Sequence, residues 1–238
     1  MSLSSISPIA QAFPNTPVAG QRRLLDTGLD RSFEAGDILV RQGEDARLVL
    51  VLDGYLGLRR TTDDGRELVV RIIRAGGLAA IMVIASRPAI FDIVAITRCR
   101  AALWPAREIR SLASVEAGFA IDLLDHVLHT FETVVEGLDG FIYQDAVKRV
   151  SRILHLHREL FFGEQPVLTR SHLPMLVGTS REMTGRVLRR LRADGVVAPT
   201  GRNGLRILDP LRLEEIAREQ PRPRGTGGTS SSSHGRAE

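Results

Sequence analysis

Residues 169–191 limit the possible folds of this chain more than any other stretch of its sequence. They comprise a short apolar segment, a turn that contains Gly178, and a second segment with two distinct sides. At roughly 100° per residue, one side of the second segment consists of Met183, Thr184, Val187, Leu188 and Leu191. The other side consists of Arg181, Glu182, Gly185, Arg186, Arg189, Arg190 and Arg192. Thr179 and Glu182 have the spacing of a capping box, so the pattern predicts a helix-turn-helix unit whose second helix begins there.

The positive charge of the chain is concentrated in the same region. Residues 169–206 contain eight arginines against Glu182 and Asp194, a net charge of +6, whereas the whole chain carries +4. The rest of the chain therefore sums to −2. An ordinary amphipathic surface helix would also expose charges, but it would not concentrate them in this way. Such a cationic surface is typical of binding to nucleic-acid phosphates, and an arginine-bearing helix suits the major groove of DNA.

Length and composition narrow the classes of protein to which the chain can belong. A chain of 238 residues allows one large or two modest domains. No apolar run approaches the roughly 20 residues that span a bilayer, and the N-terminus lacks the order of a signal peptide, which predicts a cytoplasmic protein with no membrane contact. Cys99 is the only cysteine, so we exclude an internal disulfide, a cysteine-rich zinc site and an iron–sulfur cluster.

The N-terminal half has the pattern of a β protein. Residues 1–20 are poor in charge and rich in Ser, Pro and Ala, and we expect a flexible arm. Residues 21–112 contain short apolar runs separated by turns such as Asp53-Gly54 and Gly76-Gly77. The expected strands are 38–41, 49–52, 55–60, 67–73, 81–84 and 93–97. Many short strands at this spacing predict an all-β roll or barrel.

In residues 113–143 the apolar residues recur with a helical period. One apolar stripe has alternating spacings of four and three residues, and it consists of Ala120, Leu124, Val127, Phe131, Val134, Leu138 and Phe141. A second stripe repeats every seven residues and consists of Ile121, Leu128, Val135 and Ile142. A long helix of this kind can bury one stripe on its own roll and the other, the heptad, on a partner as a dimer seam. The alternative is a monomer in which the helix buries one broad face.

Residues 144–215 predict a winged helix-turn-helix domain. Asp145 can cap a helix that runs to about Leu160, and residues 167–168 form a short strand. Residues 196–198 and 205–208 flank an Asn-Gly turn and predict a hairpin. Such a hairpin after a helix-turn-helix is a wing, and Arg202 at its tip could contact phosphate. Residues 216–238, with a Gly/Ser-rich end, predict a disordered tail.

Together these features resemble the Crp–Fnr family of bacterial transcription regulators over roughly residues 25 to 210. The motifs that carry the resemblance are Gly36-Asp37, Gln42-Gly43-Glu44 and Asp53-Gly54, the long helix with Asp145 at its end, and the segment from Val177 to Leu188. The resemblance implies an α+β fold with an N-terminal double-stranded β-helix, a dimerisation helix and a C-terminal winged helix-turn-helix. It also implies a homodimer on a palindromic operator, with RNA polymerase as a partner.

The recognition segment is similar to that of the catabolite-activator branch, which implies a TGTGA-like half-site. Arg181 and Arg186 would donate to guanine, and Glu182 would accept from cytosine. The full set of expected DNA contacts is Thr169, Arg170, Ser180, Arg181, Glu182, Gly185, Arg186, Arg189 and Arg202. Met183 stands where that branch commonly has a phosphate-contacting threonine.

The sensor half departs from the same branch. Its cyclic-nucleotide binders have a Gly-Glu-Leu segment followed by Arg-Ser-Ala, and a Thr-Ser pair on the long helix. The expected effector pocket consists here of Leu78, Ala79, Met82, Arg87, Phe91, Val134 and Val135. Leu78 stands in the place of the glutamate, and Val134 and Val135 stand in the place of the Thr-Ser pair. Because these three positions are apolar here, a buried cyclic nucleotide phosphate would lack partners, and cyclic AMP is disfavoured.

Several alternatives stay open for the effector. An apolar small molecule suits this lining, and so does haem as a gas sensor with His126 or His129 as axial ligand. A pocket filled by its own side chains needs no effector. A β-roll module that acts on a protein partner is the competing function. An enzyme is disfavoured, because the chain has no glycine-rich phosphate loop, no paired histidines with a carboxylate at metal spacing, and no recognisable Ser-His-Asp motifs.

Overall fold

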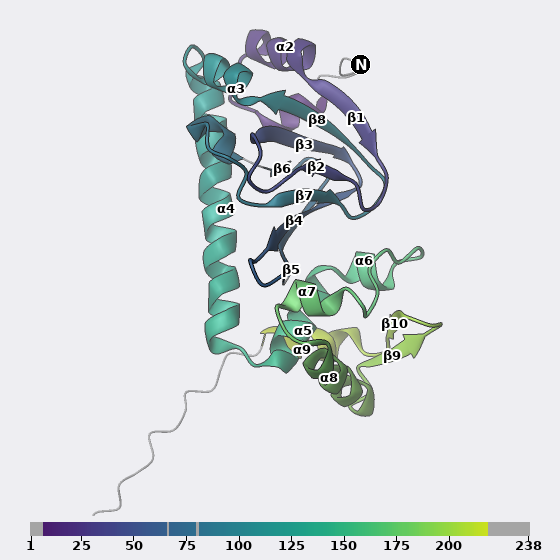
Figure 1. Ribbon diagram of the computed structural model, residues 1–238. Helices are drawn as coiled ribbons and strands as arrows, with labels where there is room; N and C mark the ends of the chain where they lie inside the picture. Colours follow the sequence, from purple (N-terminus) through teal and green to yellow (C-terminus); the bar gives the residue numbers. More distant parts are fainter. Residues whose placement is uncertain (1–6, 66, 80, 219–238) are drawn as a thin grey trace, which may run out of the picture.

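The computed structural model describes residues 7–65, 67–79 and 81–218, with the backbone alone described at 81 and 136–143. A β-roll, a long helix beside it and a smaller C-terminal domain follow one another along the chain (Figure 1). The strands of the roll are β1 (Leu29–Phe33), β2 (Ile38–Val40), β3 (Arg47–Asp53), β4 (Tyr55–Thr61), β5 (Glu67–Arg74), β6 (Leu78–Ala79), β7 (Asp92–Ala95) and β8 (Cys99–Pro105). The helices around them are α1 (Ser7–Ala12), α2 (Val18–Thr27), the 3₁₀ helix η1 (Ile81–Ala85), α3 (Ala106–Ala113) and α4 (Ala117–Tyr143).

The strands form two antiparallel sheets, with the orders β1-β8-β3-β6 and β2-β7-β4-β5. Leu50, Leu56, Ile93 and Trp104 lie in the core between them with at most 1% of their surface exposed. Inward apolar side chains from many short strands are what the sequence pattern requires of a roll, so the predicted fold class is confirmed.

The predicted strand at residues 81–84 is wrong, because these residues form η1. Val83 is fully buried while Met82 is 42% exposed, and neither belongs to a sheet. A short continuous apolar run has no period that separates a strand from one turn of helix. The pattern also missed β1, β6 and β8.

The expected flexible arm is also wrong for residues 7–20, whereas residues 1–6 lie outside the described part. The side chains of Ile9 and Phe13 are fully buried, and the Phe13 ring lies 5.1 Å from that of Phe119 on α4. The buried carboxylate of Asp122 accepts hydrogen bonds from the Asn15 backbone N–H at 3.0 Å and the Thr16 hydroxyl at 2.6 Å. The low charge of this segment therefore reflects burial rather than disorder.

Helix α4 places neither predicted stripe on the roll. The roll and the N-terminal helices instead cover Phe119, Asp122 and Leu123, each at most 2% exposed. The described members of both stripes are exposed, with large side chains at Ile121, Leu124, Val127, Leu128, Phe131, Val134 and Val135. The side chains of Leu138, Phe141 and Ile142 lie outside the described part. The two stripes therefore form one continuous apolar face that points away from the roll.

The C-terminal domain consists of α5 (Ala146–Leu156), α6 (Arg158–Phe162), α7 (Leu173–Val177), α8 (Arg181–Ala193), β9 (Val197–Thr200), β10 (Gly204–Ile207) and α9 (Pro210–Arg218). Asp145 caps α5 as predicted, accepting from the Lys148 N–H at 2.9 Å. Helix α5 ends four residues before Leu160. Residues 167 and 168 are not a strand, since both backbone N–H groups donate to the Leu160 carbonyl. Helix α9 extends into the predicted tail, and residues 219–238 lie outside the described part.

The C-terminal domain lies against the β4–β5 hairpin of the roll (Figure 1). Val69 on β5 is buried within the core of that domain, and Tyr55, Ile72 and Ile96 are partly buried against it. Helix α7 contacts β5 directly. The C-terminal domain is therefore docked on the β-roll through side chains of both. No helix in the described ranges is long and apolar enough to cross a membrane.

Candidate nucleic-acid interface

A left-handed glycine makes the turn between α7 and α8. Gly178 has φ +66° and ψ +46°, a conformation that L side chains adopt at a cost. Helix α8 then begins after Ser180, whose hydroxyl oxygen accepts from the Met183 N–H at 3.1 Å. The predicted capping box at Thr179 is wrong by one residue, because Gly178 ends α7 and leaves Thr179 in the turn. Glu182 instead pairs with Arg186 at 2.9 Å, one helical turn along.

The two predicted sides of α8 are confirmed. Thr184, Val187 and Leu191 are buried, which fixes the rotation of the helix. The opposite side exposes the charged side chains at 181, 182, 186, 189, 190 and 192. The Arg186 side chain is 63% exposed and the Glu182 side chain is 80% exposed. Arginine donors and a glutamate acceptor are side-chain types that pair with base edges in a major groove.

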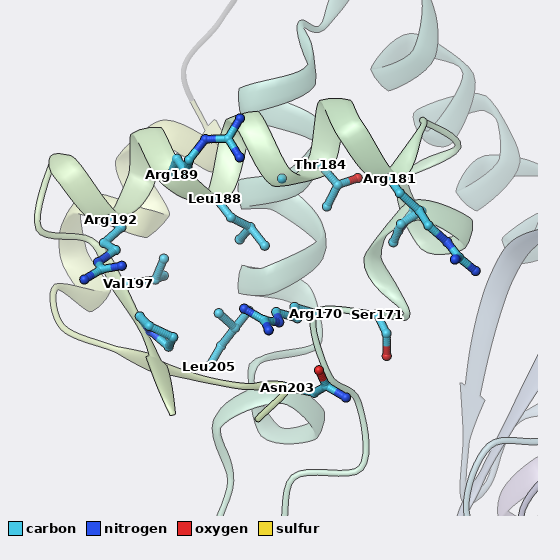
Figure 2. A pocket seen from close by; sticks show the side chains of 13 residues that line it. Arg170, Ser171, Arg181, Thr184, Leu188, Arg189, Arg192, Val197, Asn203 and Leu205 are labelled. Carbon is cyan, nitrogen blue, oxygen red and sulfur yellow. The ribbon is translucent and has the colours of Figure 1, made fainter. Parts of the chain in front are cut away.

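A cationic groove of about 480 Å³ separates α8 from the β9–β10 hairpin (Figure 2). Its arginines come from separate segments: Arg170 precedes α7, whereas Arg181, Arg189 and Arg192 lie along α8. The hairpin contributes Pro199 and Asn203 to the opposite wall. Arg192, Ser171 and Asn203 were absent from the predicted site, and only their position in the folded domain brings them to it. Four arginines around one groove give it the positive charge that favours phosphate groups.

Arg170 joins the wing to the helix-turn-helix. Its guanidinium Nη2 donates to the Arg202 carbonyl at 2.7 Å, and its backbone N–H donates to the Asn203 carbonyl at 3.1 Å. The predicted hairpin is present with the exposed Arg202 at its tip, but its strands are 197–200 and 204–207. Gly204 pairs with Thr200 in β10, so the loop is Gly201-Arg202-Asn203 and not an Asn-Gly turn. Arg170 therefore holds the wing in place besides lining the groove.

The remaining predicted contacts also lie on this face. The Thr169 backbone N–H donates to His172 Nδ1 at 2.9 Å, and its hydroxyl lies 2.7 Å from that of Ser171. Gly185 faces open space: a Cβ atom there would meet only the end of the Arg189 side chain, at 3.8 Å. A backbone or phosphate group can therefore approach α8 closely at this position.

The predicted effector residues differ in burial. Leu78 and Ala79 are buried in the roll, whereas Met82, Arg87, Val134 and Val135 are exposed. Phe91 is partly buried against the roll core. Leu78 lines a cavity of about 710 Å³ beside α4, whose described lining includes none of the other six.

The haem-ligand candidates have protein partners. His126 Nε2 lies 2.9 Å from the Ala12 carbonyl oxygen, and its ring meets the Phe13 ring edge-on at 6.1 Å. His129 is 67% exposed, with Nδ1 4.0 Å from a Glu132 carboxylate oxygen.

Burial raises the pKa of the Cys99 thiol to about 11, aided by the charges of Asp37 and Asp53. In the part of the chain that the structure describes, no cluster of three or more His, Cys, Asp or Glu side chains could hold a metal ion.

Two protein-family models match the chain. The cyclic nucleotide-binding domain matches residues 30–115, and the Crp-like helix-turn-helix domain matches residues 148–216. A curated relative, the patatin-like phospholipase domain-containing protein ZK370.4 of Caenorhabditis elegans, is 35% identical over 89 residues, which is 34% of this chain. The chain spans only 7% of the length of that relative.

Solved structures share the whole architecture. A Crp/Fnr-family transcriptional regulator from Eubacterium rectale has a TM-score of 0.74 and 21% identity, covering 85% of this chain and 95% of its own. A Crp/Fnr-family regulator from Thermus thermophilus has a TM-score of 0.68 and 23% identity, covering 81% and 100%. FixK2 from Bradyrhizobium japonicum has a TM-score of 0.67 and 15% identity, covering 79% and 96%. The two matched domains in this order, on this fold, show that the chain belongs to the Crp–Fnr family.

Proposed function

We propose that this protein is a sequence-specific transcription regulator that binds, as a homodimer, a palindromic operator with TGTGA-like half-sites. The observation that carries the proposal is the exposed arginine face of α8 beside a cationic groove and a wing. In this proposal, residues 21–112 form the sensor, residues 113–143 the dimerisation helix and residues 144–215 the DNA-binding domain. Helices α1 and α2 belong with the sensor, because they are buried against it.

The base contacts come from one short stretch of α8. Arg181 and Arg186 donate to guanine O6 and N7, and Glu182 accepts from cytosine N4. The 2.9 Å pair between Glu182 and Arg186 supports this assignment, since it holds both groups side by side on the exposed face before DNA arrives.

The phosphate contacts surround those residues. Ser180 accepts from the Met183 N–H, which leaves its hydroxyl hydrogen to donate to a phosphate at the N-terminus of α8. Thr169, Arg189 and Arg202 supply further donors, Arg170 joins them from the groove wall, and Gly185 permits close approach.

The exposed apolar face of α4 supports the homodimer. Its described large side chains are 41–64% exposed from Ile121 to Val135. A soluble protein rarely exposes so long an apolar stripe unless a partner covers it. A second α4 helix packed in the heptad register would cover it and relate two DNA-binding domains by a two-fold axis.

The effector is not cyclic AMP in this proposal. The expected nucleotide contacts at Leu78, Val134 and Val135 are apolar, and the last two lie exposed on α4. RNA polymerase is the proposed protein partner and the cytoplasm the proposed location, both from family membership. The matched C. elegans protein contributes nothing to this assignment, because the shared segment is a small part of it.

The deciding experiment measures fluorescence anisotropy of a labelled duplex with two inverted TGTGA half-sites, centred one helical turn apart (about 34 Å). The comparison duplex has the same base composition with scrambled half-sites, and both are titrated over a salt series. We expect tighter binding to the palindrome and an affinity that falls steeply with salt. Equal affinity for both duplexes would show that binding is not sequence-specific. Salt-independent binding to a protein partner would favour a regulatory module that does not bind DNA. An absorption spectrum of the same sample checks for bound haem by its Soret band.

A further inference from the structure

The cavity of about 710 Å³ lies where three parts of the chain meet. One wall comes from β5 and the following turn, at residues 71–78. A second comes from α4, through His126, His129 and Thr130, and the third from residues 156–160 at the junction of α5 and α6. The sensor and the DNA-binding domain thus each supply part of one cavity, whose volume suits a ligand of nucleotide size.

The lining of this cavity is cationic. Arg71 and Arg74 come from β5 and Arg158 from α6, against the single carboxylate of Glu159, so these charged side chains carry a net charge of +2. The imidazoles of His126, His129 and His157 add neutral or cationic hydrogen-bonding groups. The apolar contribution comes from side chains such as Tyr55 and Leu160.

Arg71 is the cationic group of the cavity that is best placed to bind an anion. It is half-buried, and its Nη1 donates to the Thr130 hydroxyl of α4 at 3.1 Å. Within the described residues, no carboxylate lies within 4.0 Å of Arg71, Arg74 or Arg158. Burial lowers the pKa of Arg71 and that of His157, which face the same cavity. A partly desolvated guanidinium without a counter-ion is destabilising, and an anion beside it would relieve that cost.

We propose that this cavity binds a small polyanion, a phosphate- or carboxylate-bearing molecule of up to nucleotide size. Arg71 of the sensor and Arg158 of the DNA-binding domain hold it from opposite sides. Of the positions expected to contact a cyclic nucleotide, Leu78 lines this cavity, whereas Arg87, Val134 and Val135 do not. The complete site exists only while the two domains keep this arrangement, so the ligand stabilises this arrangement. A consequent change in operator affinity rests on the proposed function, whereas the binding itself does not.

The test is isothermal titration calorimetry of the full-length protein without DNA, with pyrophosphate as the phosphate probe and citrate as the carboxylate probe. We expect at least one probe to bind the wild type. Each of the variants Arg71→Gln and Arg158→Gln should lower the affinity for that probe roughly ten-fold, as loss of a charge-assisted hydrogen bond predicts. Arg158 is exposed, so its variant tests the site even if Arg71→Gln fails to fold. Which probe binds tells phosphate from carboxylate chemistry.

Two controls separate this site from general attraction to arginine. Arg98→Gln removes an exposed arginine outside both sites, 79% exposed and near Glu34, and should bind the probe as the wild type does. Arg189→Gln removes a charge from the groove beside α8. Binding of neither probe to the wild type overturns the proposal. So does an equal effect of Arg98→Gln and Arg158→Gln, or a loss confined to Arg189→Gln, which would place the anion on the DNA-binding face.

Discussion

Arg71 and His157 show at the residue scale how the position of a side chain sets its chemistry. They are 86 positions apart in the sequence and line the same cavity between the domains. Burial lowers the pKa of both groups. In the sequence His157 follows the apolar Leu156, and that local pattern does not show the cavity that His157 lines. Its place beside Arg71 follows from the packing of the two domains.

The stability of the protein should fall as the solution becomes mildly acidic, partly because of His157. Burial lowers the pKa of His157 in the folded state from its ordinary value of 6.5. The unfolded chain then binds more protons as pH falls through 6.5, so the free energy of unfolding decreases with falling pH. We expect His157→Gln to reduce this decrease in urea unfolding compared at about pH 7.5 and pH 5.5. Identical pH dependence in the variant and the wild type would show that His157 does not contribute.

At the scale of the element, α8 depends on both its cap and its exposed side. Ser180 fixes where the helix begins, and the buried Thr184, Val187 and Leu191 fix its rotation. The arginines then face outward without any further constraint from packing. One element therefore separates the residues that hold it in place from the residues proposed to contact DNA.

Ser180→Ala should lower the free energy of unfolding by about 1 kcal/mol, the usual contribution of an N-cap hydroxyl. The matched control is Thr179→Ala, which removes a hydroxyl from the preceding residue without removing the bond to the Met183 N–H. Urea unfolding of both variants measures the difference. If Thr179→Ala proved the more destabilising of the two, the helix would begin at Thr179 after all.

Arg186→Ala should weaken operator binding by about 1–3 kcal/mol and relax specificity at one base pair. Arg202→Ala should instead weaken binding to all sequences alike, because the wing tip is assigned to phosphate. Anisotropy titrations against operators with single-base changes separate the two patterns. The matched control, Arg190→Ala, removes an arginine of the same helix that lies near Asp194 instead. A uniform loss for Arg186→Ala would make it a phosphate contact.

At the scale of the whole molecule, α4 lies beside the β-roll and leads into the C-terminal domain, and it carries the proposed dimer seam. The roll covers one side of it through Phe119 and Leu123. The cavity between the domains lies beside His126 and Thr130. The apolar face stays uncovered. A single helix can thereby relate an event in the sensor to the relative position of two DNA-binding domains.

Phe131→Glu should convert the proposed dimer into a monomer. Phe131 is 64% exposed on the apolar face, so the change costs little in a folded monomer but places a charge at the centre of the seam. Light scattering after size-exclusion chromatography gives the mass, and circular dichroism checks that the variant is folded. Glu132→Ala, at an adjacent position outside both stripes, serves as the control. An unchanged dimer mass for Phe131→Glu would refute the seam.

The sequence by itself determined the features that depend on neighbouring residues. The sidedness of α8, the Gly178 turn and the Asp145 cap follow from local periodicity and turn chemistry, and all lie where they were predicted. The hairpin is present too, but Gly204 lies in β10 rather than in the turn. The exact start of α8 was missed by one residue, because Thr179 and Ser180 are both good caps and only the fold of the turn selects between them.

The tertiary structure decided everything that depends on residues far apart in the chain. Asn15 and Thr16 became ordered only because Asp122 lies beside them, and the face of α4 that meets the roll was set by Phe119 rather than by either regular stripe. The cationic cavity exists only where β5, α4 and α6 meet. A sequence pattern shows which side chains share a surface, but the partner of that surface is chosen by shape and burial across the whole molecule.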